Sequence, residues 1–181
     1  MIIETTRLVL RALTPDDAEA IVARNRAGRA WARDFPTPGD VNVADAALRG
    51  RAAFAIDTMP WGLFTIVEQS SGQSIGGIGF KTAPNERGEV EIGYGVCHSY
   101  QGRGVATEAV LALCDFARRG ARVVLADTDR DNVSSQRVLE KSGFQSCGEN
   151  AELFFWRKEL TAPEHVVPTK HASSTGDSQI S

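Results

Sequence analysis

The spacing of hydrophobic residues changes several times along the chain, and each change marks a predicted element. Leu8 and Leu10 share one face of residues 7–13, which predicts a strand. Directly after it, the sequence Thr-Pro-Asp-Asp from Thr14 places a capping residue, a first-turn proline and an acid in the order that begins a helix. Residues 42–57 are rich in alanine and predict a second helix.

The middle of the chain predicts strands, and the second half alternates between helix and strand. Strands are expected at residues 61–68, 74–81 and 89–97. A helix is expected over residues 103–119, because its spacing places these apolar residues on one face: Ala106, Ala109, Val110, Leu113, Phe116 and Ala117. The remaining expected elements are a buried strand at 122–126, a short helix at 132–142 and a closing strand at 153–160. This order predicts one mixed αβ domain over residues 1–160, followed by a flexible polar tail at 161–181.

Composition narrows the class of protein and its partners. The 181 residues are 42% hydrophobic and 24% charged, which excludes a chain that is disordered throughout. The net charge of −3 gives no basic footprint, so nucleic acid is not an expected partner. No apolar run is long enough to span a membrane, and the first residues lack an apolar leader. We therefore expect no membrane contact and a cytoplasmic location.

The cysteines argue against two kinds of site. Cys97, Cys114 and Cys147 are odd in number and form no C-x-x-C pair, so neither a disulfide framework nor a zinc site fits, and no metal is expected. A reducing compartment is the simple inference. His165 and His171 lie in the predicted tail, where solvated side chains are expected rather than metal ligands.

Residues 101–106 carry the most informative pattern, between a predicted strand and a predicted helix. Gly102 and Gly104 remove side chains, so consecutive backbone N–H groups can converge on one point. The start of the following helix adds a partial positive charge, and Arg103 adds a full one. The pattern predicts a site for phosphate oxygens, with a plain tight turn as the structural alternative.

A dinucleotide fingerprint is a rival explanation of these glycines. Asp127 ends the next predicted strand, where a ribose-binding acid would lie. However, Thr107 stands where a third glycine or an alanine is expected, and too few βα units follow to build a doubly wound sheet. A Walker loop fails because the Gly-Lys-Ser/Thr sequence is absent.

The sequence Gln101-Gly-Arg-Gly-Val-Ala106 resembles the Q/R-x-x-G-x-G/A loop of the GNAT superfamily of acyl-CoA-dependent N-acetyltransferases. Further motifs resemble the branch of that superfamily that includes ribosomal-protein N-terminal acetyltransferases. These motifs are Glu4-Thr-Thr-Arg-Leu8 with Leu10-Arg11, Glu91-Ile-Gly-Tyr94, Ala106-Thr-Glu-Ala109, and Asn132-x-x-Ser135 followed by Gly143-Phe144.

This resemblance implies a mixed, mostly antiparallel sheet that is flanked by helices and splayed at the fourth strand, with acetyl-CoA as co-substrate. The pantetheine arm would pair with that strand's backbone, the pyrophosphate would lie on the glycine loop, and Asn132 would hydrogen-bond the arm. The expected activity is acetyl transfer to a primary amine, on a protein N-terminus or a small molecule, by direct attack. The expected cofactor-binding residues are Val96, Cys97, Gln101, Gly102, Arg103, Gly104, Val105, Ala106, Asn132 and Ser135.

Glu91 is the expected general base, because it shares a strand face with Gly93 and Gly95, which leave space above the strand. Its alternative role is a structural acceptor for a backbone group or an arginine. Many relatives carry a tyrosine proton donor four positions beyond Ser135, but this chain has Leu139 there. The resemblance to the ribosomal-protein acetyltransferase branch implies Ser135 as the proton donor instead. Capping of a helix is the alternative role of Ser135.

Backbone N–H groups near Val96 or Cys97 are expected to hold the thioester oxygen, as an oxyanion hole does. A covalent role for the Cys97 thiol is the alternative, but a free cysteine is more often a small buried hydrophobe, and the only neighbouring base is His98. Tyr94 alternates away from Glu91 and is expected in the core.

The acceptor is the least predictable part of the function. Trp31, Phe35 and Trp61 either line an acceptor pocket or fill the core. Whether two copies of the chain form a homodimer is left open. A non-catalytic acyl-CoA-binding sensor is the alternative function: Glu91 favours the enzyme, and the missing tyrosine favours the sensor.

Overall fold

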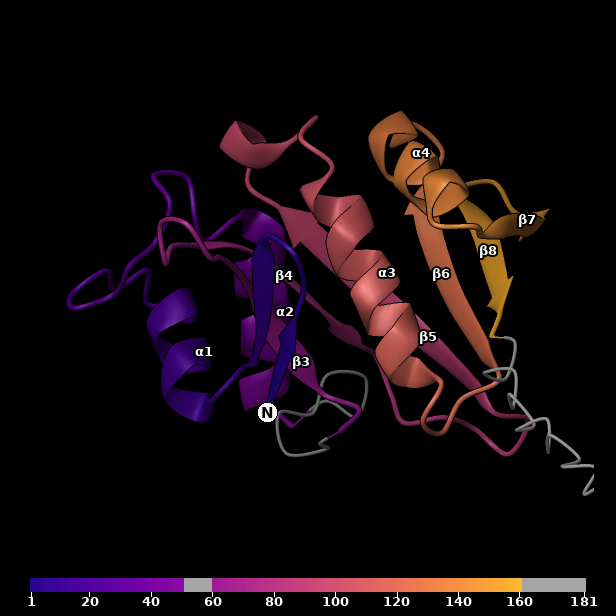
Figure 1. The fold of residues 1–181 in the computed structure, drawn as a ribbon, viewed down its shortest axis with the longest axis horizontal. Helices are drawn as coiled ribbons and strands as arrows, with labels where there is room; N and C mark the ends of the chain where they lie inside the picture. The colour runs from indigo at the N-terminus through magenta and orange to yellow at the C-terminus, as the bar shows by residue number, and fades with distance from the viewer. Residues whose placement is uncertain (51–59, 161–181) are drawn as a thin grey trace, which may run out of the picture.

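One mixed sheet with helices on both faces organises the computed structural model, which describes residues 1–50 and 60–160 (Figure 1). Its spatial strand order is β1-β2-β3-β4-β5-β6-β8-β7, and neighbours are antiparallel except β5 and β6. This confirms the expected mixed, mostly antiparallel sheet. The strands are β1 (Ile2–Glu4), β2 (Leu8–Ala12), β3 (Leu63–Glu68), β4 (Ser74–Phe80), β5 (Glu89–Val96), β6 (Val123–Asp129), β7 (Gln145–Glu149) and β8 (Leu153–Glu159).

The sheet opens between its two parallel strands. Glu89, Val90 and Glu91 of β5 pair with β6, and the pairing stops there. Beyond Glu91, β5 continues to Val96 beside β4, while β6 continues beside β8. The opening lies at the strand predicted as the fourth, which is β5 because the short strand β1 precedes the first predicted one.

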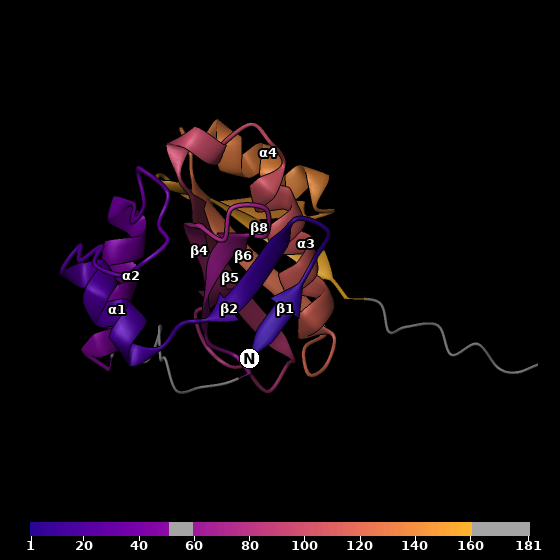
Figure 2. The same cartoon turned by 60° about the vertical axis from the view of Figure 1, so that its left-hand side comes forward.

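Two pairs of helices lie on opposite sides of the strands (Figure 2). Helices α1 (Pro15–Val22) and α2 (Pro38–Leu48) lie on one side, and α3 (Val105–Ala117) and α4 (Val133–Lys141) lie on the other. A short 3-10 helix, η2 (His98–Tyr100), connects β5 to the glycine loop.

Helix α2 corrects one expected boundary. It begins at Pro38, four residues before the predicted start, because Thr37 caps it and Asp40 bonds back to Thr37 in a capping box. Helix α1 begins in the same way at Thr14 and Asp17. Helix α2 ends at Leu48. The last part of the predicted helix, residues 51–57, and the expected tail at 161–181 lie outside the described residues.

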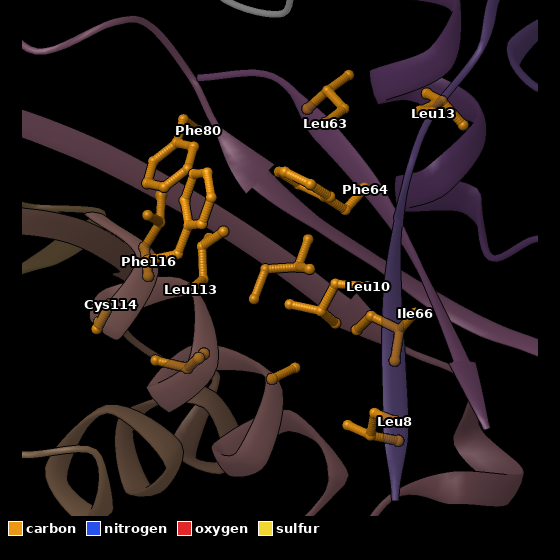
Figure 3. Packing of buried hydrophobic residues seen from close by; sticks show 14 of the residues in the cluster. Leu8, Leu10, Leu13, Leu63, Phe64, Ile66, Phe80, Leu113, Cys114 and Phe116 are labelled. Atoms are coloured by element: carbon orange, nitrogen blue, oxygen red, sulfur yellow. The ribbon is translucent and has the colours of Figure 1, made fainter. Parts of the chain in front are cut away.

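The main core lies between the strands and α3 (Figure 3). Leu10 and Ile66 face each other across β2 and β3 and are fully buried, while Leu113 reaches them from α3. Phe80 and Phe116 close the same layer, with ring centroids 6.4 Å apart. Removing this apolar area from water fixes α3, and with it the loop at its N-terminus, against the sheet.

Two strands, β1 and β7, were not expected from the sequence. Cys147, expected in a loop, lies on β7, where it is exposed, whereas Cys114 is buried on α3 as expected. Within residues 1–50 and 60–160, every helix is too short or too polar to cross a membrane.

Candidate active site

A groove of about 300 Å³ occupies the opening of the sheet. One wall is the end of β5, one is the loop that leads into α3, and the third is α4. Its lining residues are Tyr94, Gly95, Val96, Tyr100, Gln101, Gly102, Gly104, Val105, Ala106, Thr107, Ser134, Ser135, Arg137, Val138 and Lys141.

The loop presents bare backbone to this groove. Gly102 and Gly104 have φ angles of 73° and 77°, a region that glycine adopts without strain, and a Cβ on Gly102 would meet no other atom within 4 Å. Side chains cap α1, α2 and α4, whereas α3 begins at Gly104 without a side-chain cap. The first N–H groups of any helix lack an intrahelical partner. Those of α3 have no capping side chain either, so they suit phosphate oxygens.

Two N-terminal residues hold this loop in place. Thr5 Oγ1 and the Arg7 backbone N–H donate to Glu108 Oε1 at 2.6 and 2.9 Å, and Arg7 Nε donates to Oε2 at 2.7 Å. Arg7 Nη1 also donates to the carbonyl of Arg103 at 3.0 Å. Burial raises the pKa of Glu108, but these hydrogen bonds outweigh it and lower that pKa overall. We call these contacts of Thr5 and Arg7 with Glu108 the clamp. The clamp gives the opening Thr-Thr-Arg motif and Glu108 a shared structural role.

A second cavity, of about 130 Å³, lies on the opposite side of β5, toward α1 and α2. Gly77 and Gly79 of β4 pair with Gly95 and Gly93 of β5, and all four line this cavity. Because these neighbouring positions carry no side chains, the sheet is hollow there. Tyr94 and Gly95 line both the groove and this cavity, so the two meet at one point of β5.

Known proteins are similar to this chain in sequence and in fold. The sequence matches the family described as "Acetyltransferase (GNAT) domain" over residues 7–145. The chain belongs to the GNAT acetyltransferase family. Transfer of an acetyl group from acetyl-CoA is the chemistry of this family, so the chain is an acyltransferase and acetyl-CoA is its donor. The alternative of a non-catalytic sensor is not supported.

Individual relatives agree with the family. The uncharacterized N-acetyltransferase YoaA of Bacillus subtilis (strain 168) is 30% identical over 154 residues, covering 81% of this chain and 84% of the relative. YjdG of the same organism is 34% identical over 93 residues, covering 50% of this chain and about half, 55%, of the relative. The solved RimL ribosomal L7/L12 alpha-N-protein acetyltransferase in complex with coenzyme A has a TM-score of 0.64 and 22% identity, covering 90% of this chain and 100% of that one.

Most residues predicted to bind acetyl-CoA line the groove. Cys97, Arg103 and Asn132 are not among its lining residues. Asn132 caps α4 instead, because its Oδ1 accepts from the Ser135 N–H at 3.1 Å. The Arg103 guanidinium lies over the ring of Tyr100, 5.2 Å from its centroid. The predicted residues that do line the groove are Val96, Gln101, Gly102, Gly104, Val105, Ala106 and Ser135.

Strand geometry separates the two N–H groups expected to hold the thioester oxygen. The Cys97 N–H donates to the carbonyl of Ile75 on β4 at 2.8 Å. Successive backbone groups of a strand point in opposite directions, so the Val96 N–H points away from β4 and into the opening. The Val96 carbonyl confirms this direction, since Gln101 Nε2 donates to it at 3.3 Å from the loop.

Glu91 lies in a charge cluster at the point where β5 and β6 separate. Lys81 Nζ lies 2.5 Å from Glu91 Oε1 and 3.1 Å from Asp127 Oδ2. Burial lowers the pKa of Lys81, but the two carboxylates outweigh it and raise that pKa overall. The partner of Glu91 is thus a lysine rather than an arginine. Its second oxygen makes no hydrogen bond with another described residue, and Glu91 borders neither cavity.

Three other predicted side chains have distinct surroundings. Cys97 is fully buried, and burial raises the pKa of its thiol to about 12, which opposes a nucleophilic role. Tyr94 is partly buried and donates to the Ser135 carbonyl at 3.1 Å. Phe35 lines the second cavity, whereas Trp61 packs on Phe80 in the core at 5.0 Å. Trp31 is buried edge-on against Phe35.

Sequence reasoning missed the basic side chains of α4. Arg137 and Lys141 line the groove together with Ser134 and Val138. The spacing of these residues in the sequence could have indicated this, since positions three or four residues apart share one face of a helix.

Proposed function

We propose that the chain moves an acetyl group from acetyl-CoA in the groove directly to a primary amine that enters through the second cavity. The observation that carries this proposal is the meeting of the two spaces at Tyr94 and Gly95. Donor and acceptor would approach one strand from opposite faces, which lets the amine reach the thioester without an acetylated enzyme.

The donor would be held by backbone and charge. The pyrophosphate would lie on the N–H groups of residues 102–107 at the uncapped start of α3. Arg137 and Lys141 line the same groove and would neutralise phosphate charge. The pantetheine arm would run along the backbone edge of β5 that β6 leaves unpaired beyond Glu91, past Ser135 and near the cap formed by Asn132.

The transfer itself needs one oxygen held, one proton removed and one proton supplied. The Val96 N–H would hold the thioester oxygen while the amine nitrogen bonds to the carbonyl carbon. Glu91 would take the amine proton through water, using the oxygen that Lys81 does not bind. As the carbon–sulfur bond breaks, the Ser135 hydroxyl would pass a proton to the thiolate and regain one from water, while Glu91 releases the amine proton to solvent.

Two kinds of amine are candidates for the acceptor. The solved relative named for ribosomal L7/L12 acts on a protein α-amine by its description, which makes a protein N-terminus one candidate. A small-molecule amine is the other. We place the reaction in a reducing cytoplasm, which the three free cysteines support.

An amine-library assay tests the proposal. The full chain is mixed with acetyl-CoA and each of a set of peptides and small amines, and free thiol is measured. Thiol release that depends on one class of amine is expected, with the acetylated product identified by mass. Acetyl-CoA binding without thiol release for any amine in the set contradicts the proposed transfer.

A further inference from the structure

Helices α1 and α2 both begin with a capping box, and the two capping boxes differ in a way that indicates a ligand. Thr14-Pro-Asp-Asp17 begins α1 and Thr37-Pro-Gly-Asp40 begins α2, each as a capping box. In α1, the Asp17 oxygen that is not used in the capping box also has a partner, because Asp17 Oδ1 accepts from Arg29 Nη1 at 2.9 Å. Each oxygen of Asp17 therefore has a partner in the chain.

Asp40 uses only one of its oxygens. The Thr37 N–H and Oγ1 donate to Asp40 Oδ2 at 2.8 and 2.6 Å. Among the described residues, no hydrogen bond reaches Oδ1 and no cation pairs with Asp40. Burial raises the pKa of this carboxyl even though the Thr37 hydrogen bonds lower it. A carboxylate in such surroundings gains more from a cationic partner than one in water.

The second oxygen faces the empty side of the sheet. A Cβ on Gly77 would lie 2.7 Å from Asp40 Oδ1, so this oxygen lies directly above β4. Gly77 pairs with Gly95, one of the two residues that border both the cavity and the groove. A cation held by Oδ1 would therefore lie beside the position where the acetyl group is expected.

The rest of the cavity is mostly apolar, with Thr65 and Tyr94 as its hydroxyl-bearing residues. Its lining includes Leu13, Ile21, Phe35, Val43 and Phe64, and Asp40 is the only carboxylate among the described residues around it. A single carboxylate in an apolar cavity selects a ligand with one positive charge and a hydrocarbon body. Polyamines and hydrophilic amines would leave charges or hydroxyl groups unpaired there.

We propose that Asp40 Oδ1 binds the acceptor in its ammonium form, which loses one proton to solvent before the neutral amine attacks, and that the acceptor is a compact primary amine with an apolar substituent. This inference rests on the proposed function for the direction of acetyl transfer, but not for amine binding itself. The same chemistry occurs in a free alkylamine and in the α-amine of a peptide that begins with an apolar residue.

Binding to the wild-type chain gives the first test. Calorimetry is run on the full chain saturated with coenzyme A, which cannot acetylate, using isoamylamine, isoamyl alcohol and spermidine as probes. We expect isoamylamine to bind at least tenfold more tightly than the uncharged alcohol and than spermidine, since a hydrogen bond to a charged group contributes about 1.5–3 kcal/mol. Equal affinity for the amine and the alcohol overturns the inference. A pentapeptide that begins with leucine is compared with isoamylamine, and the tighter of the two identifies the source of the amine.

A pair of matched variants gives the second test. Asp40→Asn keeps an oxygen for Thr37 and removes the charge, so isoamylamine affinity should fall about 10- to 100-fold. Asp17→Asn makes the same change in the other capping box, away from the cavity, and should leave that affinity unchanged. Equal amine affinity in folded Asp40→Asn and wild type contradicts the inference. Amine binding that depends on Asp40, without thiol release when acetyl-CoA replaces coenzyme A, supports the inference and contradicts the proposed transfer.

Discussion

Lys81 stands between two carboxylates at the point where the sheet opens, and this arrangement defines how Glu91 can act. One oxygen of Glu91 is held by Lys81, and Asp127 shares the same lysine. Because the pKa of Lys81 is raised, its ion pairs persist below the ordinary lysine value of 10.5 and are lost only as the pH rises through the higher folded value. Lys81 therefore stays protonated at neutral pH.

Replacing Glu91 by Gln tests the base. Loss of a general base lowers kcat/KM by about 10²–10⁴-fold, and the remaining rise with pH should follow amine deprotonation alone. Acetyl-CoA affinity should change little, because Glu91 does not line the groove. Asp127→Asn is the matched control, since it removes the other carboxylate from Lys81 and should retain most activity. Equal losses in both variants would assign the effect to cluster charge instead of proton transfer.

Cys97→Ala tests direct transfer. The Cys97 thiol is fully buried and its pKa is raised to about 12, so almost none is thiolate at neutral pH. The variant should keep most of its kcat and lose about 1 kcal/mol of unfolding free energy from the small cavity it creates. Initial rates with both substrates varied should follow sequential kinetics. Acetyl-Cys97 that forms and decays at the turnover rate, detected by mass spectrometry, would contradict direct attack.

At the scale of elements, α3 differs from the other helices in how it begins. Gly104 supplies a φ of 77° and leaves the first N–H groups without a side-chain cap. Leu10, Ile66 and Leu113 pack α3 against the sheet. The helix is thus fixed along its length and open at its start, as a phosphate site requires.

Gly104→Val should impair donor binding. A β-branched residue at this positive φ costs about 1–3 kcal/mol, and its methyl groups would cover the N–H groups. We expect at least a tenfold loss of acetyl-CoA affinity by calorimetry. Gly72→Val is the control, because Gly72 has a φ of 68° in a turn and does not line the groove. The control should lose comparable stability and bind acetyl-CoA normally; unchanged affinity in folded Gly104→Val would refute the phosphate site.

Glu108→Gln tests the clamp between the first residues and α3. The change weakens the bonds from Thr5 and Arg7 to a carboxylate, at a cost of about 1–3 kcal/mol in unfolding free energy. Because Arg7 also holds the Arg103 carbonyl, acetyl-CoA affinity should fall severalfold. Asp115→Asn, at the exposed far end of α3, should change stability by less than about 1 kcal/mol and leave affinity intact. Equal melting temperatures for the Glu108 variant and wild type would rule out the clamp.

Element predictions succeeded where local chemistry decides the structure. Thr14 begins α1 as expected, and α3 begins at Val105, two residues after its expected start at 103, because caps and glycines act through near neighbours. The start of α2 at Thr37 carried the same signal and was overlooked. Strand β7 gave no signal, since all of its side chains are exposed and it is held mainly by its pairing with β8.

At the scale of the molecule, three residue pairs form the only backbone ladder between two halves of the sheet in the described chain. One half carries β1 to β5, and the other carries β6, β8 and β7. The donor groove lies across this division, with the glycine loop on one side and α4 on the other (Figure 1). A ligand in the groove would join the halves.

Acetyl-CoA should therefore stabilise the whole domain. At a concentration 100-fold above Kd, binding adds about 2.7 kcal/mol to the unfolding free energy, seen as a higher melting temperature. Hydrogen exchange should slow both at the end of β5 and in α4, since both line the groove proposed for the donor. NAD at the same concentration should produce neither effect. Protection confined to the glycine loop would contradict a donor that bridges the opening.

The active-site cavities could not be predicted to the same extent as the fold. Glu91, Gly93 and Gly95 were placed on one face from alternation along a single strand, which needs no partner. The matching face of β4, with Gly77 and Gly79, depends on the register between strands. Asp40 reaches that face from a helix far away in the sequence, so only the fold relates it to the site.

The alternation of β5 has an evolutionary consequence. Odd-numbered positions such as 93 and 95 face the acceptor side, while the backbone groups of 94 and 96 face the donor side. The residues that shape the acceptor side and the backbone groups that face the donor thus alternate along one short segment. A single-nucleotide change at the Gly93 codon can introduce alanine, valine or serine, and such a side chain would reshape the second cavity, which Gly93 lines, and not the groove, which it does not line. Duplicated copies of such a gene can diverge in substrate range by these changes while they continue to draw on the same cellular pool of activated acetyl groups.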